Sequence, residues 1–415
     1  MQYFHYQNNE LHAEEVNLKD IAKHFGTPCY VYSRAALENN WQSFHRAFGK
    51  VAHRICYAVK ANSNIAILNL LAQLNSGFDI VSLGELERVL SAGGDPKKIV
   101  FSGVGKKSAE IIRALETGIY CFNVESAVEL ERINALAKQI NKIAPIALRI
   151  NPNIDAKTHP HIATGLKENK FGIEFEKALP LSREIKAMPN LKLIGIACHI
   201  GSQLTEISPF IEALDRVKEL AAQIAAEGIQ LEHLNIGGGL GIRYQDEQPP
   251  SIEEYVSTIC DHMKGLPYQI ILEPGRAITA NAGILLTAVE YVKHTPHKNF
   301  AIVDAAMNDL IRPVLYDAWQ NILPVNSHEV HTPEEYDIVG PVCETGDFLG
   351  KNRTLAIAPG SLLAICCAGA YGFSMSSNYN SRPRVAEVMV DKAKTHLIRR
   401  RETIEELYAS EKILS

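Results

Sequence analysis

Short apolar segments alternate with amphipathic helical segments eight times between residues 55 and 276. The apolar segments end in polar residues or glycine and are expected to be strands: 55–61, 77–82, 98–103, 120–126, 146–152, 195–202, 231–239 and 269–276. Stretches between them, such as 83–93 and 211–228, repeat apolar residues at helical spacing. One (β/α)8 TIM barrel needs about this length of chain. A doubly wound open sheet is the alternative, and the missing dinucleotide-binding fingerprint favours the barrel.

The pattern changes near residue 280, and a second fold is expected there. Later segments are strand-like and lack regular helices between them. We therefore predict a (β/α)8 barrel over 34–278 and a mostly β domain over 279–415. Residues 1–33, which include "CYVYS", are expected to be a leader that adds a strand to the β domain. The ending "RRRETIEELYAS" predicts a solvated helix.

Composition excludes several classes of protein. The net charge of −5 over 415 residues shows no excess of basic residues of the kind that binds nucleic acid or a membrane surface. No apolar run is long enough to span a membrane, and the first residues lack the features of a signal peptide. Eight scattered cysteines without a C-x-x-C pair indicate reduced thiols, with neither a disulfide framework nor a metal site. A cytoplasmic protein is expected.

The lysine in "CYAVKANSN", Lys60, lies at the predicted end of an apolar strand. Most such lysines only hold their charge in water. Here all eight strands end in polar residues or glycine, and in a barrel these ends share the face that carries active sites. The pattern therefore favours a chemical role for Lys60.

The loops after the seventh and eighth strands, "GGGLGIRY" and "EPGR", are candidates for a phosphate site. Gly237, Gly238 and Gly239 would let backbone N–H groups approach an anion, or would only form a tight turn. Ser202 at the end of the sixth strand can add a hydroxyl donor. A phosphate site that faces a lysine suggests pyridoxal phosphate.

Three further strand-end side chains fit that cofactor. Lys60 would form the Schiff base, and Glu273 would pair with the pyridine nitrogen. His199 would stack on the ring, or would be a hydrogen-bonded core histidine. Asp79 would tune Lys60, or would cap a turn.

Seven motifs occur in one order along the chain: "YAVKAN", "HIGSQ", "GGGLG", "EPGR", "RPVLY", "CETGD" and "AGAYGFSMSSNYNSRPR". With them the sequence resembles the fold-type III pyridoxal-phosphate decarboxylases over nearly its whole length. The resemblance implies a homodimer, a covalent link between Lys60 and the cofactor, and ring stacking by His199. It assigns the phosphate to Ser202, the Gly237–Gly239 loop, Gly275 and Arg276. The stretch "GVGKK" at 103–107 departs from the family, so no role is assigned to it.

The resemblance is strongest to the branch that converts meso-diaminopimelate to L-lysine and carbon dioxide. It assigns the distal carboxylate of that substrate to Arg276, Arg312 and Tyr316, and the distal ammonium to Glu344. It places Tyr371 beside cofactor and substrate. Arg312 could instead form a salt bridge between domains. A decarboxylase of ornithine, arginine or carboxynorspermidine is the enzymatic alternative, and an inactive relative that only binds a partner is the other.

Cys343 differs from the other cysteines because it lies in a polar turn, "PVCETGD". A thiol there could act as the general acid that protonates the substrate carbon after carbon dioxide leaves. The resemblance implies that this cysteine reaches the site of the partner subunit.

Overall fold

The structure, a computed structural model, describes residues 3–155, 169–328 and 331–414. It forms two compact units. The barrel unit comprises 40–242 and 248–277, and the strand-rich unit comprises the residues before 40, 243–247 and those from 278 onward. Among the described residues, no helix has both the length and the apolar character needed to cross a membrane.

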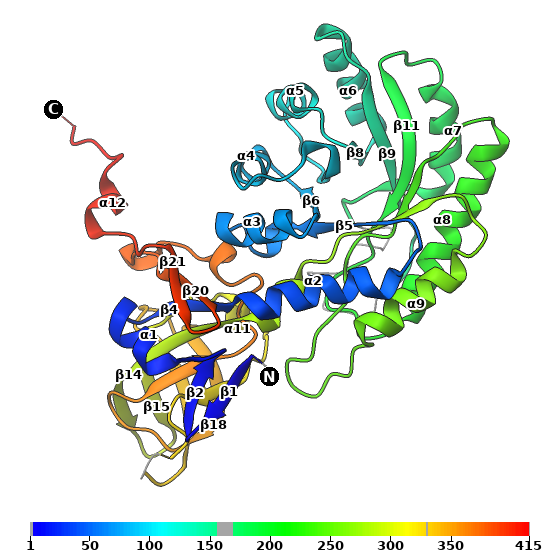
Figure 1. The fold of residues 1–415 in the computed structure, drawn as a ribbon. Helices are drawn as coiled ribbons and strands as arrows, with labels where there is room; N and C mark the ends of the chain where they lie inside the picture. The colour runs from blue at the N-terminus through cyan, green and yellow to red at the C-terminus, as the bar shows by residue number, and fades with distance from the viewer. Residues whose placement is uncertain (1–2, 156–168, 329–330, 415) are drawn as a thin grey trace. The chain divides into compact units, whose positions relative to one another are not determined.

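The barrel unit holds a closed ring of eight parallel strands, which confirms the predicted (β/α)8 barrel. The strands follow one another around the ring in chain order: β5 (His53–Ala58), β6 (Gly77–Ile80), β7 (Ile99–Phe101), β8 (Cys121–Val124), β9 (Ala144–Asn151), β11 (Leu191–Cys198), β12 (His233–Asn235) and β13 (Gln269–Leu272). Figure 1 labels β5, β6, β8, β9 and β11 of this ring. Pairing of β8 with β9 and of β13 with β5 closes the ring. A two-residue strand, β10 (Ile173–Glu174), pairs with β9 outside the ring and was not predicted.

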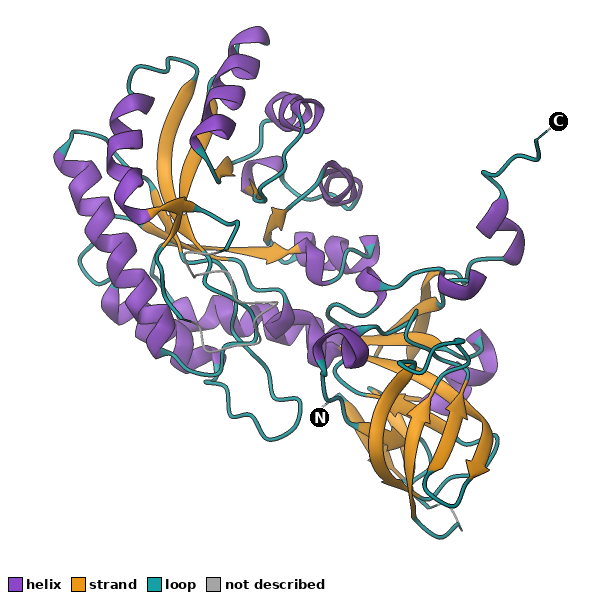
Figure 2. Ribbon diagram, turned by 180° about the vertical axis from the view of Figure 1, so that it is seen from behind, coloured by secondary structure: helices purple, strands orange, loops and turns teal. Residues whose placement is uncertain are grey.

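Helices surround this ring, as Figure 2 shows. They are α2 (Arg34–Phe48), α3 (Ile65–Gln73), α4 (Leu83–Ser91), α5 (Ser108–Thr117), α6 (Ala127–Gln139), α7 (Phe175–Ile185), α8 (Ser208–Ala226) and α9 (Ile252–His262). Before α4, α6 and α9 stand Ser82, Ser126 and Ser251, whose hydroxyl oxygens each accept the N–H of a glutamate three residues later. This serine cap satisfies an otherwise unpaired N–H and fixes where each helix begins.

The predicted first strand is too long at its carboxyl end. β5 ends at Ala58, and Lys60 lies in a 3-10 turn, η1 (Val59–Ala61). The Tyr57 hydroxyl donates to the carbonyl of Asn62 at 2.9 Å, and the side chain of Asn64 caps the following helix. The chain must therefore turn sharply between strand and helix, and Lys60 lies in that turn.

The strand-rich unit is built around the 12-residue strand β14 (Gly283–His294), which pairs with three neighbours. Its strands are β4 (Cys29–Ser33), β15 (Asn299–Val303), β16 (Ile322–Pro324), β17 (Glu334–Val339), β18 (Phe348–Leu355), β19 (Leu362–Ile365), β20 (Ala386–Asp391) and β21 (Lys394–Arg399). β4 lies between β14 and β20 in the sheet. A small separate sheet contains β1 (Phe4–Gln7), β2 (Glu10–Ala13) and β3 (Val16–Asn17). The predicted mostly β fold of this region is confirmed.

The helices of the strand-rich unit are short: α1 (Leu18–Phe25), α11 (Arg312–Tyr316) and α12 (Ile404–Tyr408), with α10 (Arg276–Thr279) crossing from the barrel unit. The predicted terminal helix corresponds to α12, which begins with a capping box at Thr403. The arginines that precede α12 are not all simply solvated. Arg399 pairs with the buried Glu387, and Arg401 donates to the carbonyl of Pro28 at 2.7 Å.

Candidate active site

The carboxyl ends of the barrel strands carry the predicted barrel residues. These residues all belong to the barrel unit: Lys60, Asp79, His199, Ser202, Gly237, Gly238, Gly239, Glu273, Gly275 and Arg276. Hydrogen bonds link them into a few small groups, each described below.

Lys60 and Asp79 form an ion pair with 2.7 Å between Nζ and Oδ2. Asp79 lies on β6, next to Ala58 of β5 in the sheet, so strand pairing brings the two residues together. The Asp79 side chain is fully buried, whereas that of Lys60 is 36% exposed. Asp79 Oδ1 is buried without a hydrogen-bond partner in the described part of the chain. A buried carboxylate oxygen without a hydrogen bond lowers stability. A bound group that donates a hydrogen bond to Asp79 Oδ1 would remove this penalty.

Glu273 follows β13 and is buried at the same end of the barrel. Two amides donate to its Oε1, Asn235 Nδ2 at 2.6 Å and Asn123 Nδ2 at 3.2 Å. Among the described residues no hydrogen bond reaches Oε2. Burial, followed by the charge of Asp79, raises the pKa of Glu273 to about 7. One oxygen is thus fixed by the protein, while the other can accept a hydrogen bond from a bound group.

Asn123 and Asn235, which together clamp Glu273 Oε1, were not predicted from the sequence. Asn235 also accepts the N–H of Gly237 on its Oδ1 at 2.8 Å, so it joins the Glu273 carboxylate to the glycine loop. Asn123 donates in addition to Ser102 Oγ at 2.9 Å. The available signal was a buried polar residue inside an apolar strand, in "CFNV" and in "HLN".

The glycine loop, Gly237–Gly239, packs so closely that side chains are excluded. A Cβ on Gly238 would lie 2.1 Å from the carbonyl oxygen of Glu273. Gly237 has φ +75°, and a Cβ there would lie 2.8 Å from His199 Nδ1. Glycine is needed at both positions because no other residue fits this close approach. Gly237 and Gly238 are buried, and their N–H groups donate to Asn235 and His199, so the partly exposed Gly239 is the position of this loop whose backbone can approach a phosphate.

His199 accepts the N–H of Gly238 on Nδ1 at 3.2 Å. An accepting Nδ1 carries no proton, so the neutral ring carries its proton on Nε2. Burial, with the positive charges of Arg149 and Lys60, lowers the pKa of His199 well below its ordinary value. His199 is therefore a neutral, oriented ring, which suits stacking on a flat partner.

Arg276 begins α10 and donates from Nη2 to Ser202 Oγ at 3.1 Å. The arginine is buried, so its charge is held at the strand ends. Gly275 precedes it, and a Cβ at that position would lie 3.0 Å from the Cβ of Ala61. The close packing places the Arg276 backbone directly beside the Lys60 turn.

Buried charges support this end of the barrel. Arg149 pairs with Glu125 at 2.5 Å, and the N–H groups of Gly103 and Gly172 also donate to that carboxylate. The 103–107 loop, which had been given no role, contributes Lys106. Its buried ammonium donates to the carbonyls of Gly103 and Asn123, both at 2.8 Å, and to Glu129 Oε1 at 2.6 Å.

The remaining predicted residues belong to the strand-rich unit. Arg312 and Tyr316 begin and end α11. Arg312 is buried, and its guanidinium carbon lies 4.7 Å from the ring centre of Tyr244. The structure gives this cation–π contact for Arg312, a contact that sequence spacing could not reveal.

Cys343, Glu344 and Tyr371 also lie in this unit. Cys343 is exposed, and its N–H donates to Asn380 Oδ1 at 3.0 Å. A hydrogen bond with Glu344 raises the pKa of Tyr379. Tyr371 has φ +56°, a left-handed conformation that a tyrosine seldom adopts and that is often found at functional sites.

The barrel residues fit pyridoxal phosphate by the chemistry of their donors and acceptors. Lys60 supplies an amine, Gly239 and Arg276 supply donors for a phosphate, and Glu273 keeps one oxygen for a ring nitrogen. Asp79 Oδ1 is an orphaned buried acceptor beside the amine.

Residues 34–280 match the family described as "Pyridoxal-dependent decarboxylase, pyridoxal binding domain". The chain is 58% identical to diaminopimelate decarboxylase of Vibrio cholerae, with all of both chains covered. The chain belongs to the diaminopimelate decarboxylase family. The Pseudomonas aeruginosa enzyme of that name is 56% identical, again over all of both chains.

A solved member of the diaminopimelate decarboxylase family has the same fold. The crystal structure of the Helicobacter pylori enzyme complexed with L-lysine superposes with a TM-score of 0.92 at 44% identity. It covers 95% of this chain and 99% of its own. The chain is thus a pyridoxal-phosphate-dependent decarboxylase by family, as the sequence predicted.

Proposed function

We propose that this protein removes carbon dioxide from meso-diaminopimelate and releases L-lysine, the last step of lysine synthesis by that route. The observation that carries the proposal is the group at one barrel end: Lys60 paired with Asp79, beside the clamped Glu273 and the glycine loop. The names of the relatives support the choice of substrate.

The barrel residues divide the work of holding the cofactor. When bound, pyridoxal phosphate supplies an electron sink for the charge left on the substrate carbon as carbon dioxide departs. Lys60 would hold it covalently, and Asp79 would hold and tune the amine. Glu273 would accept the hydrogen bond of the ring nitrogen on its second oxygen, and neutral His199 would pack against the ring. Ser202, the glycine loop, Gly275 and Arg276 would hold the phosphate.

The substrate needs a pocket that recognises its unreacting end. That end carries a carboxylate and an ammonium, which require a cation and an anion respectively. Arg276, Arg312 and Tyr316 bind the carboxylate, and Glu344 binds the ammonium. Tyr371 lies beside cofactor and substrate. The burial of Arg312 supports this role because a buried guanidinium gains most from a carboxylate partner.

Cys343 donates the proton that replaces carbon dioxide on the substrate carbon. Its exposure on the single chain supports a role in the site of a partner, since a second chain can cover it. The protein is accordingly a homodimer with shared sites, and it works in the cytoplasm.

Product analysis tests the proposed activity. The purified protein, loaded with pyridoxal phosphate, is incubated with meso-diaminopimelate, ornithine, arginine and carboxynorspermidine in separate reactions. We expect L-lysine and carbon dioxide in equal amounts from the first, and at most slow turnover of the others. Faster turnover of ornithine would assign the chain to the alternative activity. Failure to bind the cofactor at all would indicate an inactive, partner-binding relative.

A further inference from the structure

A second pocket lies in the barrel unit at the end opposite Lys60. His53 and Gln269, the first residues of β5 and β13, line it, together with Lys98, which directly precedes β7. Because the ring strands are parallel, these amino-terminal ends lie on the face away from the strand ends that carry the candidate active site. The pocket has a volume of about 550 Å³, within the range of small-molecule sites.

Positive charge dominates the walls of this pocket. Arg46, Arg54 and Lys98 line it, and no aspartate or glutamate is among the described residues of its lining. Lys98 Nζ pairs with Asn75 Oδ1 and forms a long ion pair, at 3.9 Å, with Asp95, which does not line the pocket. Three cations in a lining that holds no carboxylate among the described residues create a field that attracts anions.

Trp41 forms an aromatic wall of the pocket. It lines the pocket with only 6% of its surface exposed, so a ligand bound there would lie beside a largely buried ring.

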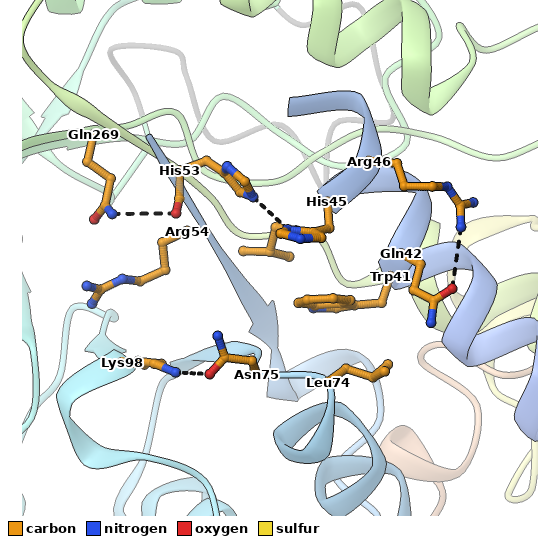
Figure 3. A pocket seen from close by; sticks show the side chains of 11 residues that line it. Trp41, Gln42, His45, Arg46, His53, Arg54, Leu74, Asn75, Lys98 and Gln269 are labelled. Atoms are coloured by element: carbon orange, nitrogen blue, oxygen red, sulfur yellow. Dashed lines mark hydrogen bonds between the residues drawn. The ribbon is translucent and has the colours of Figure 1, made fainter. Parts of the chain in front are cut away.

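Two histidines complete the wall and are rigidly oriented (Figure 3). His53 Nδ1 lies 2.7 Å from the carbonyl oxygen of Val51, and its Nε2 lies 2.9 Å from His45 Nδ1. Because a carbonyl only accepts, neutral His53 carries its proton on Nδ1 and accepts from His45 on Nε2. The His45 ring also stacks on Trp41 at 5.5 Å between centroids. This side of the pocket is therefore preformed.

We propose that this pocket binds a small, multiply charged anion, either a phosphate compound or a di- or tricarboxylate. Both classes present several acceptor oxygens to the cations of the lining, Arg46, Arg54 and Lys98. L-lysine carries a net positive charge, so the proposed product does not fit this field. The pocket is thus a ligand site separate from the decarboxylation site.

Trp41 itself reports binding. The chain has two tryptophans, so Trp319→Phe leaves Trp41 as the only one; phenylalanine keeps an aromatic ring beneath the Arg353 guanidinium. The holoenzyme of this variant is titrated with inorganic pyrophosphate and, separately, citrate, at constant ionic strength set with sodium chloride. We expect a saturable change in Trp41 fluorescence with at least one of them. The stronger ligand distinguishes the phosphate from the carboxylate class.

Charge variants test whether the signal comes from this pocket. Lys98→Gln and Arg54→Gln should each weaken binding about tenfold or more, since each removes a charged donor. Lys97→Gln is the matched control, because Lys97 is the exposed neighbour of Lys98 and does not line this pocket. Calorimetry on the unmodified holoenzyme provides a second measurement that does not depend on fluorescence. The proposal is overturned if neither anion gives saturable heat, or if Lys97→Gln weakens binding as much as Lys98→Gln.

Discussion

At the scale of single residues, Glu273 is a carboxylate whose charged form is made less stable by burial. Its pKa is raised because the carboxylate is buried near Asp79, and two amides on one oxygen offset only part of that penalty. The folded chain therefore binds a proton on Glu273 more tightly than the unfolded chain does. Without cofactor, this group makes folding less favourable as pH rises from about 4.5 to about 7.

Glu273→Gln should accordingly stabilise the cofactor-free protein at about pH 8, by roughly 1–3 kcal/mol. The amide is isosteric and carries no charge, so the burial penalty is removed. The gain should vanish below about pH 4.5, where the carboxyl group is protonated in both states. Urea unfolding at the two pH values measures it. If the variant were less stable than the parent at both pH values, the buried charge of Glu273 would not destabilise the folded protein.

Asn235 should matter to the cofactor although it is not predicted to touch it. Asn235→Ala removes a donor from Glu273 and an acceptor from Gly237, so we expect a loss of about 1–3 kcal/mol in stability. Cofactor affinity, measured by equilibrium dialysis, should also fall. Asn69→Ala is the control, because Asn69 donates to the carbonyl of Ala92 at 2.9 Å and belongs to neither group. Equal cofactor affinity in both variants would contradict the role given to Asn235.

At the scale of elements, buried Lys106 holds the loop after β7 against β8 and α6. It donates to two carbonyls and to Glu129, and Glu129 in turn accepts the N–H of Glu125. Lys106→Ala should cost about 3 kcal/mol because it removes a buried ammonium and leaves Glu129, whose side chain is only 10% exposed, without its cation. Thermal or urea unfolding gives the loss. The exposed neighbour Lys107, changed to alanine, should shift stability by less than about 0.5 kcal/mol.

Helix α11 presents Arg312 at its first residue, and the proposed role there predicts a particular kinetic pattern. Arg312→Ala should weaken diaminopimelate binding by about 2–4 kcal/mol, seen as a raised KM, because a carboxylate loses its charged partner. The absorbance of the bound cofactor should stay unchanged. An unaltered KM would place Arg312 outside the substrate pocket and return it to a structural role.

The elements differ in how far the sequence could predict them. The eight barrel strands were predictable because each carries its own apolar run and polar end. The end of β5 was not, because a hydrogen bond from Tyr57 to Asn62 turns the chain early. The hydrogen bonds to Glu273 could not be predicted from the sequence either. Asn123 lies 150 residues from Glu273 and meets it only when the barrel closes.

At the scale of the whole molecule, the residues proposed for the reaction come from both units of the chain. Lys60 belongs to the barrel unit and Cys343 to the strand-rich unit. The central claim is that these two groups meet across a two-fold interface between chains. In such a dimer each chain gives its Lys60 to one site and its Cys343 to the other.

Mixing two inactive variants tests this claim most directly. Lys60→Ala and Cys343→Ala should each be nearly inactive alone. When the two variants are co-expressed with different tags, random pairing makes about half of the dimers mixed. Each mixed dimer then has one site with both groups and one site with neither. Production of L-lysine should recover to about a quarter of the parent rate. Verified mixed dimers with no recovered activity would show that Lys60 and Cys343 do not meet across the interface.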